Sequence, residues 1–468
     1  MVEIMLPLFS GMLTLGLIIG NQRMSAGFAL ALGYALGMGI LGQLMLFIGW
    51  HEIPLSKDTI SFVLFIYSSV VSFLFLIRLY FFPSVSGHAD ERFSTTKKSL
   101  VWTHKLFFIV MAGYVLYQIG FIFWNGFFEP ISQADAFSVH AYRAKIFFYT
   151  HHLKLPSEGH YLIYPLQVPL GMAWVAFNIG QWQEGWIKMI FPLNCLAFII
   201  IIYNFMKYWT DRSTSLLTVA LMLSSLFFVL HASIAYCDFT VMFYTMASLA
   251  LMGWGIGSRH VSFIILGGLM AAFAAQVKFQ GIEYWILGII ILCRFIFTKE
   301  FSGFRFALKA LTGFILPFII VEFNFILFNT HYKITEMWNQ EHYFFPSSQG
   351  LFHRMGYMFF IVCDNLFLSG NWNLLWSFLI IAALVSWKQK KPLIVRFFGF
   401  VLAMFFTRCF LYALFSKSFV YLARYNLDNL SRFLLHFYPL CPVLIGLLIY
   451  HFLKNWRVQG ASRSLDLL

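Results

Sequence analysis

The sequence predicts an all-α polytopic membrane protein with about thirteen transmembrane helices. Of its 468 residues, 60% are hydrophobic and only 11% are charged, whereas a soluble domain carries about 25% charged residues. Apolar runs of about 17 to 25 residues, long enough to cross a bilayer as helices, recur along the chain. Short basic clusters separate these runs, as in the loops of a multi-pass protein. We expect a single integral membrane domain over residues 1–468.

The predicted spans are the long apolar segments Ile4–Gly20, Ala26–Ile48, Ile60–Phe82, Leu106–Trp124, Trp186–Met206, Thr214–His231, Phe239–Gly257, Val261–Gln276, Gly281–Phe297, Ala307–Phe328, Trp372–Trp387, Leu393–Phe415 and Phe433–Leu453. The first begins after an acid and lacks a small-x-small cleavage site, so we expect a span and not a removed signal peptide. Tyr164–Gly180 is also apolar, but it starts with two prolines and would invert every later loop. We therefore predict a re-entrant or interfacial helix there.

The basic residues predict which loops face the cytoplasm. The net charge of +13 comes from short clusters between apolar runs, not from one basic stripe, which argues against nucleic-acid binding. Residues 1–105 hold the first three spans and a loop with four basic residues, which is predicted to be cytoplasmic. Residues 125–185 and 330–370 then form two extracytoplasmic segments.

The segment Gln133–Tyr149 is predicted to be a membrane-parallel α-helix in the first extracytoplasmic segment. As a regular helix it has an apolar stripe of Phe137, Ala141, Ala144 and Phe148 and an opposite stripe of Asp135, Ser138, Tyr142 and Lys145. Asp135, its charge partly offset by Arg143 or Lys145, is the candidate base that takes a proton as an acceptor attacks an anomeric carbon. The alternative is an interfacial helix whose polar side is only solvated.

Three further ionisable residues fall on the same predicted face of the membrane, where such groups are expensive and by default functional. Asp238 begins a span, where it either caps the helix or belongs to a catalytic site. Lys278 lies between two apolar runs and either reaches the interface or meets an anion such as a lipid phosphate. Arg432 and His436, one turn apart, suit phosphate recognition, although an arginine there can also anchor a helix among headgroups.

The proline-broken approach around Tyr164 is predicted to line the rim of a sugar-lipid pocket, because irregular backbone at membrane depth needs a protein or cavity environment. His151, His152 and His160 have no standard ligand spacing, and no metal site is predicted from them.

Five short motifs occur in a fixed order between Phe121 and Leu453. They are the loop aspartate Asp135, the sequence Tyr164-Pro165-Leu166, the sequence Tyr236-Cys237-Asp238, the sequence Lys278-Phe279-Gln280-Gly281, and Arg432 followed by His436 and Pro439. In these motifs the chain resembles the GT-C superfamily of membrane glycosyltransferases, which includes protein mannosyltransferases and the aminoarabinose lipid A transferase. Asp135 has alanine on both sides, where many relatives have two adjacent acids, and Gln280 stands where several have glutamate.

The resemblance implies a GT-C-like fold and an inverting transfer of a sugar from a polyprenyl-phosphate carrier to a glycan, lipid or protein acceptor. It places the reaction on the extracytoplasmic face of a bacterial inner membrane, in contact with membrane lipid. Asp135 and Asp238 would be catalytic, and the carrier phosphate and sugar would be held by Lys278, Arg432, His436, Arg143, Lys145, Tyr164 and Gln280. It leaves the sugar, the acceptor and a divalent metal open. Two other functions remain: a transporter or flippase of lipid-linked sugar, which would predict inverted repeats, and a non-catalytic membrane subunit.

Overall fold

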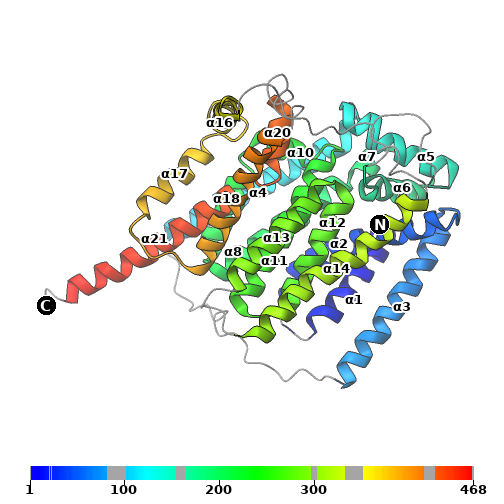
Figure 1. Ribbon diagram of the computed structural model, residues 1–468, viewed down its shortest axis with the longest axis horizontal. Helices are drawn as coiled ribbons and strands as arrows, with labels where there is room; N and C mark the ends of the chain where they lie inside the picture. The colour runs from blue at the N-terminus through cyan, green and yellow to red at the C-terminus, as the bar shows by residue number, and fades with distance from the viewer. Residues whose placement is uncertain are drawn as a thin grey trace. The chain divides into compact units, whose positions relative to one another are not determined.

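The regular structure of the described residues is entirely helical. The computed structural model describes residues 2–20, 22, 24–81, 102–153, 164–296, 303–331, 351–415 and 427–465 (Figure 1). The chain divides into two compact units: the first comprises Met1–Ile109, Ile119–Ile201 and His231–Glu341, and the second comprises Val110–Gln118, Ile202–Leu230 and His342–Leu468. The expectation of one domain over 1–468 stays a prediction.

The first unit contains α1 (Val2–Ile19), α2 (Ala26–Trp50), α3 (Lys57–Phe81), η2 (Ala136–Ala141), α5 (Tyr142–Thr150), α6 (Gln167–Ile179), α7 (Glu184–Lys188), α11 (Cys237–Ser258), α12 (Val261–Val277), α13 (Gln280–Ile296) and α14 (Phe304–His331). The second contains α9 (Arg212–Met222), α16 (Leu351–Phe367), α17 (Leu375–Val385), α18 (Leu393–Phe415), α20 (Leu427–Leu435) and α21 (Leu440–Leu465). Three helices contribute residues to both: α4 (Trp102–Phe128), α8 (Ile190–Trp209) and α10 (Leu226–His231).

Seven helical segments of the described residues are long and apolar enough to cross a membrane, judged by length and composition, and five shorter helices are also apolar. For the described residues, an all-α structure with several long apolar helices, as in a multi-pass membrane protein, is therefore confirmed. The count of thirteen spans and their sidedness stay predictions. The apolar segment after Tyr164 forms α6 of only 13 residues, which is shorter than the roughly 17 residues needed to span.

Two predicted spans are not single helices. Phe433–Leu453 is divided between α20, which ends at Leu435, and α21, which begins at Leu440. Thr214–His231 is not a single helix, because α9 ends at Met222 and α10 begins at Leu226. The cause is a pair of serines: the Ser224 hydroxyl donates to the Leu221 carbonyl at 2.7 Å, and the Ser225 hydroxyl accepts from the Phe228 amide at 3.2 Å. Serine favours such local bonds over a continuous helix, so the pair ends one helix and caps the next.

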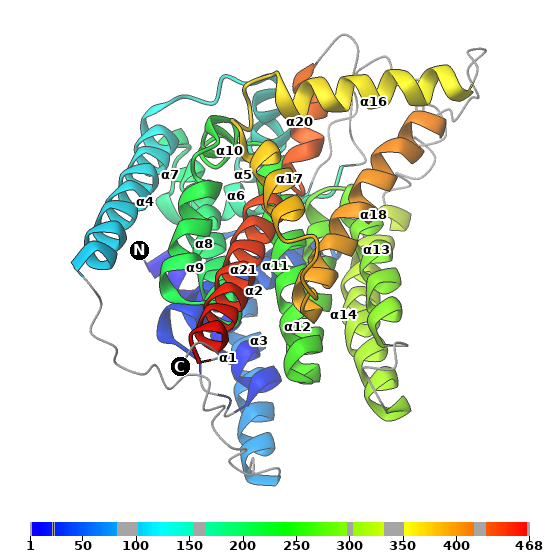
Figure 2. The same cartoon turned by 90° about the vertical axis from the view of Figure 1, so that its left-hand side faces the viewer.

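The segment 330–370 holds a helix that the sequence analysis did not expect. Its residues Leu351–Phe367 form α16. Within the second unit, Figure 2 shows α16 along its length, lying across the direction of α17 and α18, and Figure 1 shows it end-on.

Helix α2 is largely buried within the first unit: 83% of its apolar window is buried, compared with 100% for α11. A side chain at Gly37 would overlap the Pro7 carbonyl of α1, and one at Gly42 would overlap the Gln167 side chain of α6. Glycine therefore lets the backbones of α1 and α2 touch. Helices α1 and α6 therefore pack against α2 at positions where α2 has no side chain.

Side chains of α6 and α11 donate hydrogen bonds to backbone carbonyls of α2. Gln167 of α6 donates to the Met38 carbonyl at 2.5 Å, and Tyr244 of α11 donates to the Ala35 carbonyl at 3.0 Å. The first spans thus belong to the same packed unit as the predicted site residues Asp135, Asp238 and Lys278, although the family resemblance begins only at Phe121.

The short helices α5, α6 and α7 gather at one end of α11, α12, α13 and α14, as both views show (Figure 1, Figure 2). The Leu55 amide donates to the His151 carbonyl at 2.6 Å, which joins the segment after α2 to the end of α5. This end of the first unit is where the predicted site residues of that unit lie.

Candidate functional site

The segment that carries Asp135 is not one regular α-helix. Residues Ala136–Ala141 form the π-helix η2, and α5 follows directly from Tyr142. The predicted apolar stripe is therefore wrong: Phe137 is 60% exposed, whereas Ala141 and Ala144 are buried in the protein. A π turn holds more residues than an α turn and rotates the helix faces after it. The two polar side chains turned inward, His140 and Arg143, lie on neither predicted stripe.

His140 lies near four of the charged residues that the sequence predicted, namely Asp135, Arg143, Asp238 and Lys278. It is 3% exposed, and its Nδ1 atom is buried without a hydrogen-bond partner in the described part of the chain. Burial lowers the pKa of His140 from 6.5 to about 3; Arg143 and Lys278 also lower it, while Asp238 and Asp135 raise it. The imidazole is therefore neutral at neutral pH. All four charged groups lie near enough to act on it.

Arg143 connects α5 to the segment before α6. Its Nη1 donates to the Tyr164 carbonyl at 3.0 Å, while its Nη2 is buried and has no partner among the described residues. Burial lowers the pKa of Arg143 from 12.5 to about 10, so the guanidinium stays charged at neutral pH. The Tyr164 ring stacks on Phe279, with centroids 6.4 Å apart. The predicted rim residue thus touches both Arg143 and the neighbour of Lys278.

Asp238 and Lys278 form a buried ion pair. The ammonium lies 2.7 Å from Asp238 Oδ1, and the side chains are 11% and 1% exposed for the lysine and the aspartate. Asp238 lies in the first turn of α11, whose N-cap position is occupied by Tyr236. Lys278 ends α12 in an extended conformation. A side chain at Gly281 would overlap the Ala274 backbone, which explains how α13 starts so soon after α12.

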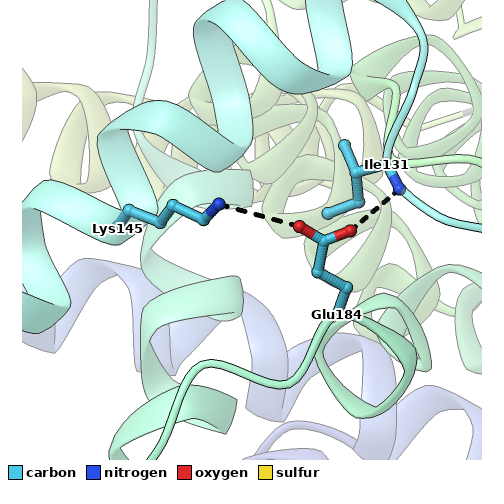
Figure 3. A network of polar contacts seen from close by, with 3 residues as sticks. All are labelled: Ile131, Lys145 and Glu184. Atoms are coloured by element: carbon cyan, nitrogen blue, oxygen red, sulfur yellow. Dashed lines mark hydrogen bonds and ion pairs between the residues drawn. The ribbon is translucent and has the colours of Figure 1, made fainter.

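Lys145 belongs to a separate network at the same end of the unit. Its ammonium lies 3.7 Å from Glu184 Oε1, and the other oxygen of Glu184 accepts from the Ile131 amide at 3.0 Å (Figure 3). The ammonium also lies 5.2 Å from the centre of the Trp182 ring. This network fastens the start of α7 to the loop before η2. Lys145 is not among the charges that act on His140.

The remaining predicted residues divide between the two units. Asp135 is half-buried at the start of η2, and Gln280 begins α13 with its Oε1 buried and unpartnered within the described residues. Arg432 and His436 belong to the second unit, at the end of α20 and just after it. The structure therefore brings Asp135, Asp238 and Lys278 together, and the meeting of all four predicted ionic groups stays a prediction.

The surroundings of α20 in the second unit are polar and aromatic. Ser431 accepts hydrogen bonds from Asn365 and Asn371, both at 2.8 Å. The Arg408 guanidinium lies 4.2 Å from the centre of the Phe433 ring. These contacts hold the start of the Arg432 and His436 motif in one conformation.

His140 and Glu322 are two of the buried polar residues that the sequence analysis did not single out. His140 gave no signal, because only the π turn reveals its inward position. Glu322 did give one: it is the single acid within the long apolar run of α14, and ionisable residues inside spans are by default functional. Its Oε1 accepts from Gln276 at 2.9 Å.

Among the described residues, no group of three histidine, cysteine or acidic side chains is arranged to hold a metal ion. His160, one of the three histidines considered for a metal, lies outside the described residues. Comparison of the chain with protein-family models, curated proteins and solved structures found no match. The cluster of Asp135, His140, Arg143, Asp238 and Lys278 therefore stands on its own geometry, with a carboxylate at its half-buried edge and two cations beside it.

Proposed function

We propose that the chain is a membrane glycosyltransferase that moves a sugar from a polyprenyl-phosphate carrier to an acceptor on the extracytoplasmic face. The observation that carries this proposal is the convergence of Asp135, Arg143, Asp238 and Lys278 on His140. These residues come from η2, α5, α11 and the end of α12, so the fold has assembled charges that are distant in sequence. Ionisable groups gathered at the end of apolar helices favour a functional site over a purely structural role.

Asp135 is the proposed base. Its half-buried position leaves the carboxylate within reach of a substrate, whereas the Asp238 side chain is only 1% exposed. The acceptor hydroxyl oxygen attacks the anomeric carbon and forms the new carbon–oxygen bond as its proton passes to Asp135. The bond from the anomeric carbon to the carrier phosphate breaks, and the phosphate leaves with the electron pair. Attack opposite to the leaving group inverts the anomeric configuration.

The Lys278 ammonium stabilises the negative charge that grows on the departing phosphate, and Arg143 binds the sugar. Lys278 suits this role because it ends α12 and keeps 11% of its side chain exposed. Asp238 is then a positioning residue that holds the Lys278 ammonium. Arg432 and His436 are proposed to bind the carrier phosphate, and Tyr164, Gln280 and Lys145 to line the sugar-lipid pocket.

The charge pattern supports an extracytoplasmic site in a bacterial inner membrane. The basic loops predicted to be cytoplasmic alternate with segments that carry few basic residues, and Asp135 lies in one of the latter. The acceptor is a glycan, a lipid or a protein, and the proposal assigns no step to a metal.

The test replaces Asp135 by asparagine and measures transfer of radiolabelled mannose, glucose or arabinose from undecaprenyl phosphate in membranes. Asparagine keeps the shape of the side chain but cannot take the proton, so we expect a loss of about 10²–10⁴-fold in rate. Asp58→Asn is the matched control, because Asp58 is an exposed acid in the first turn of α3. Transfer that survives in the Asp135→Asn protein at the level of this control would refute the proposal and favour a transporter or a subunit.

A further inference from the structure

Two buried polar atoms at the site lack a hydrogen-bond partner in the described part of the chain: His140 Nδ1 and Arg143 Nη2. Their residues are three apart on one continuous helical segment and therefore lie about one turn from each other. Buried side-chain nitrogens are nearly always partnered in folded proteins, because leaving one unpaired costs free energy. Two such atoms about one helical turn apart indicate a ligand that supplies the missing partners.

The charges around these atoms constrain what the ligand is. Four charged groups act on the imidazole: Asp135 and Asp238 are negative, and Arg143 and Lys278 are positive. The two signs cancel, since the imidazole itself is neutral. A phosphate placed between His140 and Arg143 would add buried charge that nothing balances, whereas an uncharged polar group adds none. The neighbourhood therefore fits a neutral hydrogen-bonding ligand better than an anion.

The chemistry of the two atoms narrows the choice further. Arg143 Nη2 is only a donor, and its direction is fixed because Nη1 is held by the Tyr164 carbonyl. Neutral His140 accepts at Nδ1 when the proton is on Nε2. A hydroxyl group accepts one hydrogen bond and donates another, so one hydroxyl or two adjacent ones satisfy both atoms. Sugar rings carry such groups on neighbouring carbons.

We propose that His140 and Arg143 form a subsite for the hydroxyl groups of the sugar, in which Arg143 Nη2 donates to a hydroxyl oxygen and His140 Nδ1 accepts from a hydroxyl. The identity of the ligand as the carrier-linked sugar rests on the function proposed above. His140 is then a specificity-determining residue, and the carrier phosphate binds outside this subsite. Burial and the two neighbouring cations keep the imidazole unprotonated, as an acceptor must be.

The experiment compares two lipids on the purified full-length chain in nanodiscs: undecaprenyl phosphate that carries mannose, glucose or arabinose, and undecaprenyl phosphate alone. The wild-type protein is expected to bind at least one sugar-bearing lipid more tightly than the bare lipid. His140→Asn keeps a polar atom near the position of Nδ1, whereas His140→Gln moves it to the position of Nε2. We expect the glutamine variant to lose about tenfold of the preference and the asparagine variant to keep it within about threefold.

Arg143→Lys adds an independent measurement, because lysine keeps the charge but cannot hold Tyr164 and reach the sugar together. It should lower the preference for the sugar-bearing lipid while leaving the affinity for undecaprenyl phosphate nearly unchanged. Thermal unfolding of each variant shows whether it folds. If the His140 variants do not fold, the binding preference of the Arg143→Lys protein tests the subsite. Equal losses for both lipids would overturn the subsite, because they indicate a structural defect.

The outcomes separate this inference from the proposed function. A wild-type protein that binds both lipids equally overturns the subsite, and so do asparagine and glutamine variants with the same preference as the wild type. A preference that depends on His140 in a protein without transfer activity refutes the proposed transferase but leaves the sugar subsite in place. Sugar transfer that depends on Asp135 but not on His140 supports the proposed transferase and overturns the sugar subsite.

Discussion

The ammonium of Lys278 lies 2.7 Å from Asp238 Oδ1, which joins the end of α12 to the start of α11 across 40 residues of sequence. Neither side chain is more than 11% exposed. Each charge is therefore tolerated mainly because the other is beside it. The aspartate also fixes the position of the Lys278 ammonium, and therefore its orientation towards a substrate.

Breaking this pair is expected to destabilise the protein strongly. Asp238→Asn or Lys278→Gln leaves one charge buried and uncompensated, which costs about 3–5 kcal/mol. The double variant removes both charges and should recover much of that loss. Thermal unfolding in detergent gives the comparison.

The partly exposed pair of Lys145 and Glu184 is the control for this experiment. Its side chains are 35% and 33% exposed, and solvent screens such pairs, so Lys145→Gln should cost no more than about 1 kcal/mol. Single variants of the buried pair that unfold like the Lys145→Gln protein would contradict the assignment of Asp238 as a positioning residue.

The contact of α1 with α2 depends on glycine. A methyl group at Gly37 would overlap the Pro7 carbonyl, which is backbone and cannot move aside cheaply. We expect Gly37→Ala to cost about 1–3 kcal/mol through overpacking. Gly120→Ala is the control, because nothing lies within 4 Å of a Cβ at that helical position; alanine there should be neutral or slightly stabilising. Unfolding temperatures that are equal for the two variants would disprove the close contact.

The long apolar runs were sufficient to predict a helical membrane protein, because a segment in a bilayer must satisfy its backbone internally. The basic clusters between the runs predict that Asp135, Asp238 and Lys278 lie on one face of the membrane, and all three lie near enough to His140 to act on its imidazole. The short length of α6 follows from Pro165 before it, Pro169 in its first turn and Gly180, whose left-handed conformation ends it. Composition and the distribution of charge along the chain are therefore sufficient to predict these features.

Other features depend on tertiary packing and could not be predicted in the same way. The π turn that buries His140 leaves no mark in residue periodicity, since it changes the period itself. The close packing of α2 against α6 and α11 is visible only in the structure, where Gln167 and Tyr244 donate to carbonyls of α2. The break between α9 and α10 was visible in principle, because Ser224 and Ser225 interrupt an otherwise apolar run.

Glu322 supplies a prediction for the interior of the first unit. Its Oε1 accepts from Gln276 Nε2 at 2.9 Å, and both residues are buried. Glu322→Gln keeps an oxygen that can accept this bond and should be nearly neutral. Glu322→Leu leaves the Gln276 amide unpaired and should cost about 1–3 kcal/mol.

The double variant of Glu322→Leu with Gln276→Leu replaces both partners by apolar groups and should be more stable than Glu322→Leu alone. Thermal unfolding of the four proteins forms a double-mutant cycle that isolates the pair. Additive effects of the two leucines would show that the bond contributes nothing.

The low pKa of His140 predicts how acid affects stability. The unfolded chain binds a proton on this side chain near pH 6.5, whereas the folded chain does so only near the folded pKa of about 3. Between these values the unfolded state holds more protons, so stability falls as the pH is lowered from about 6.5 towards 3. Each pH unit within this window costs up to about 1.4 kcal/mol from this group.

Asparagine at position 140 does not titrate, so His140→Asn should remove this part of the acid sensitivity. We expect the wild-type protein to lose about 2 kcal/mol more than the variant between pH 6.5 and pH 4.5. Above pH 7 the two proteins should show the same dependence on pH, since the imidazole is neutral in both the folded and the unfolded state. Thermal unfolding across this range, at constant ionic strength, measures the difference. Parallel curves for the two proteins at every pH would mean that His140 titrates normally in the folded chain and is not enclosed by Arg143 and Lys278.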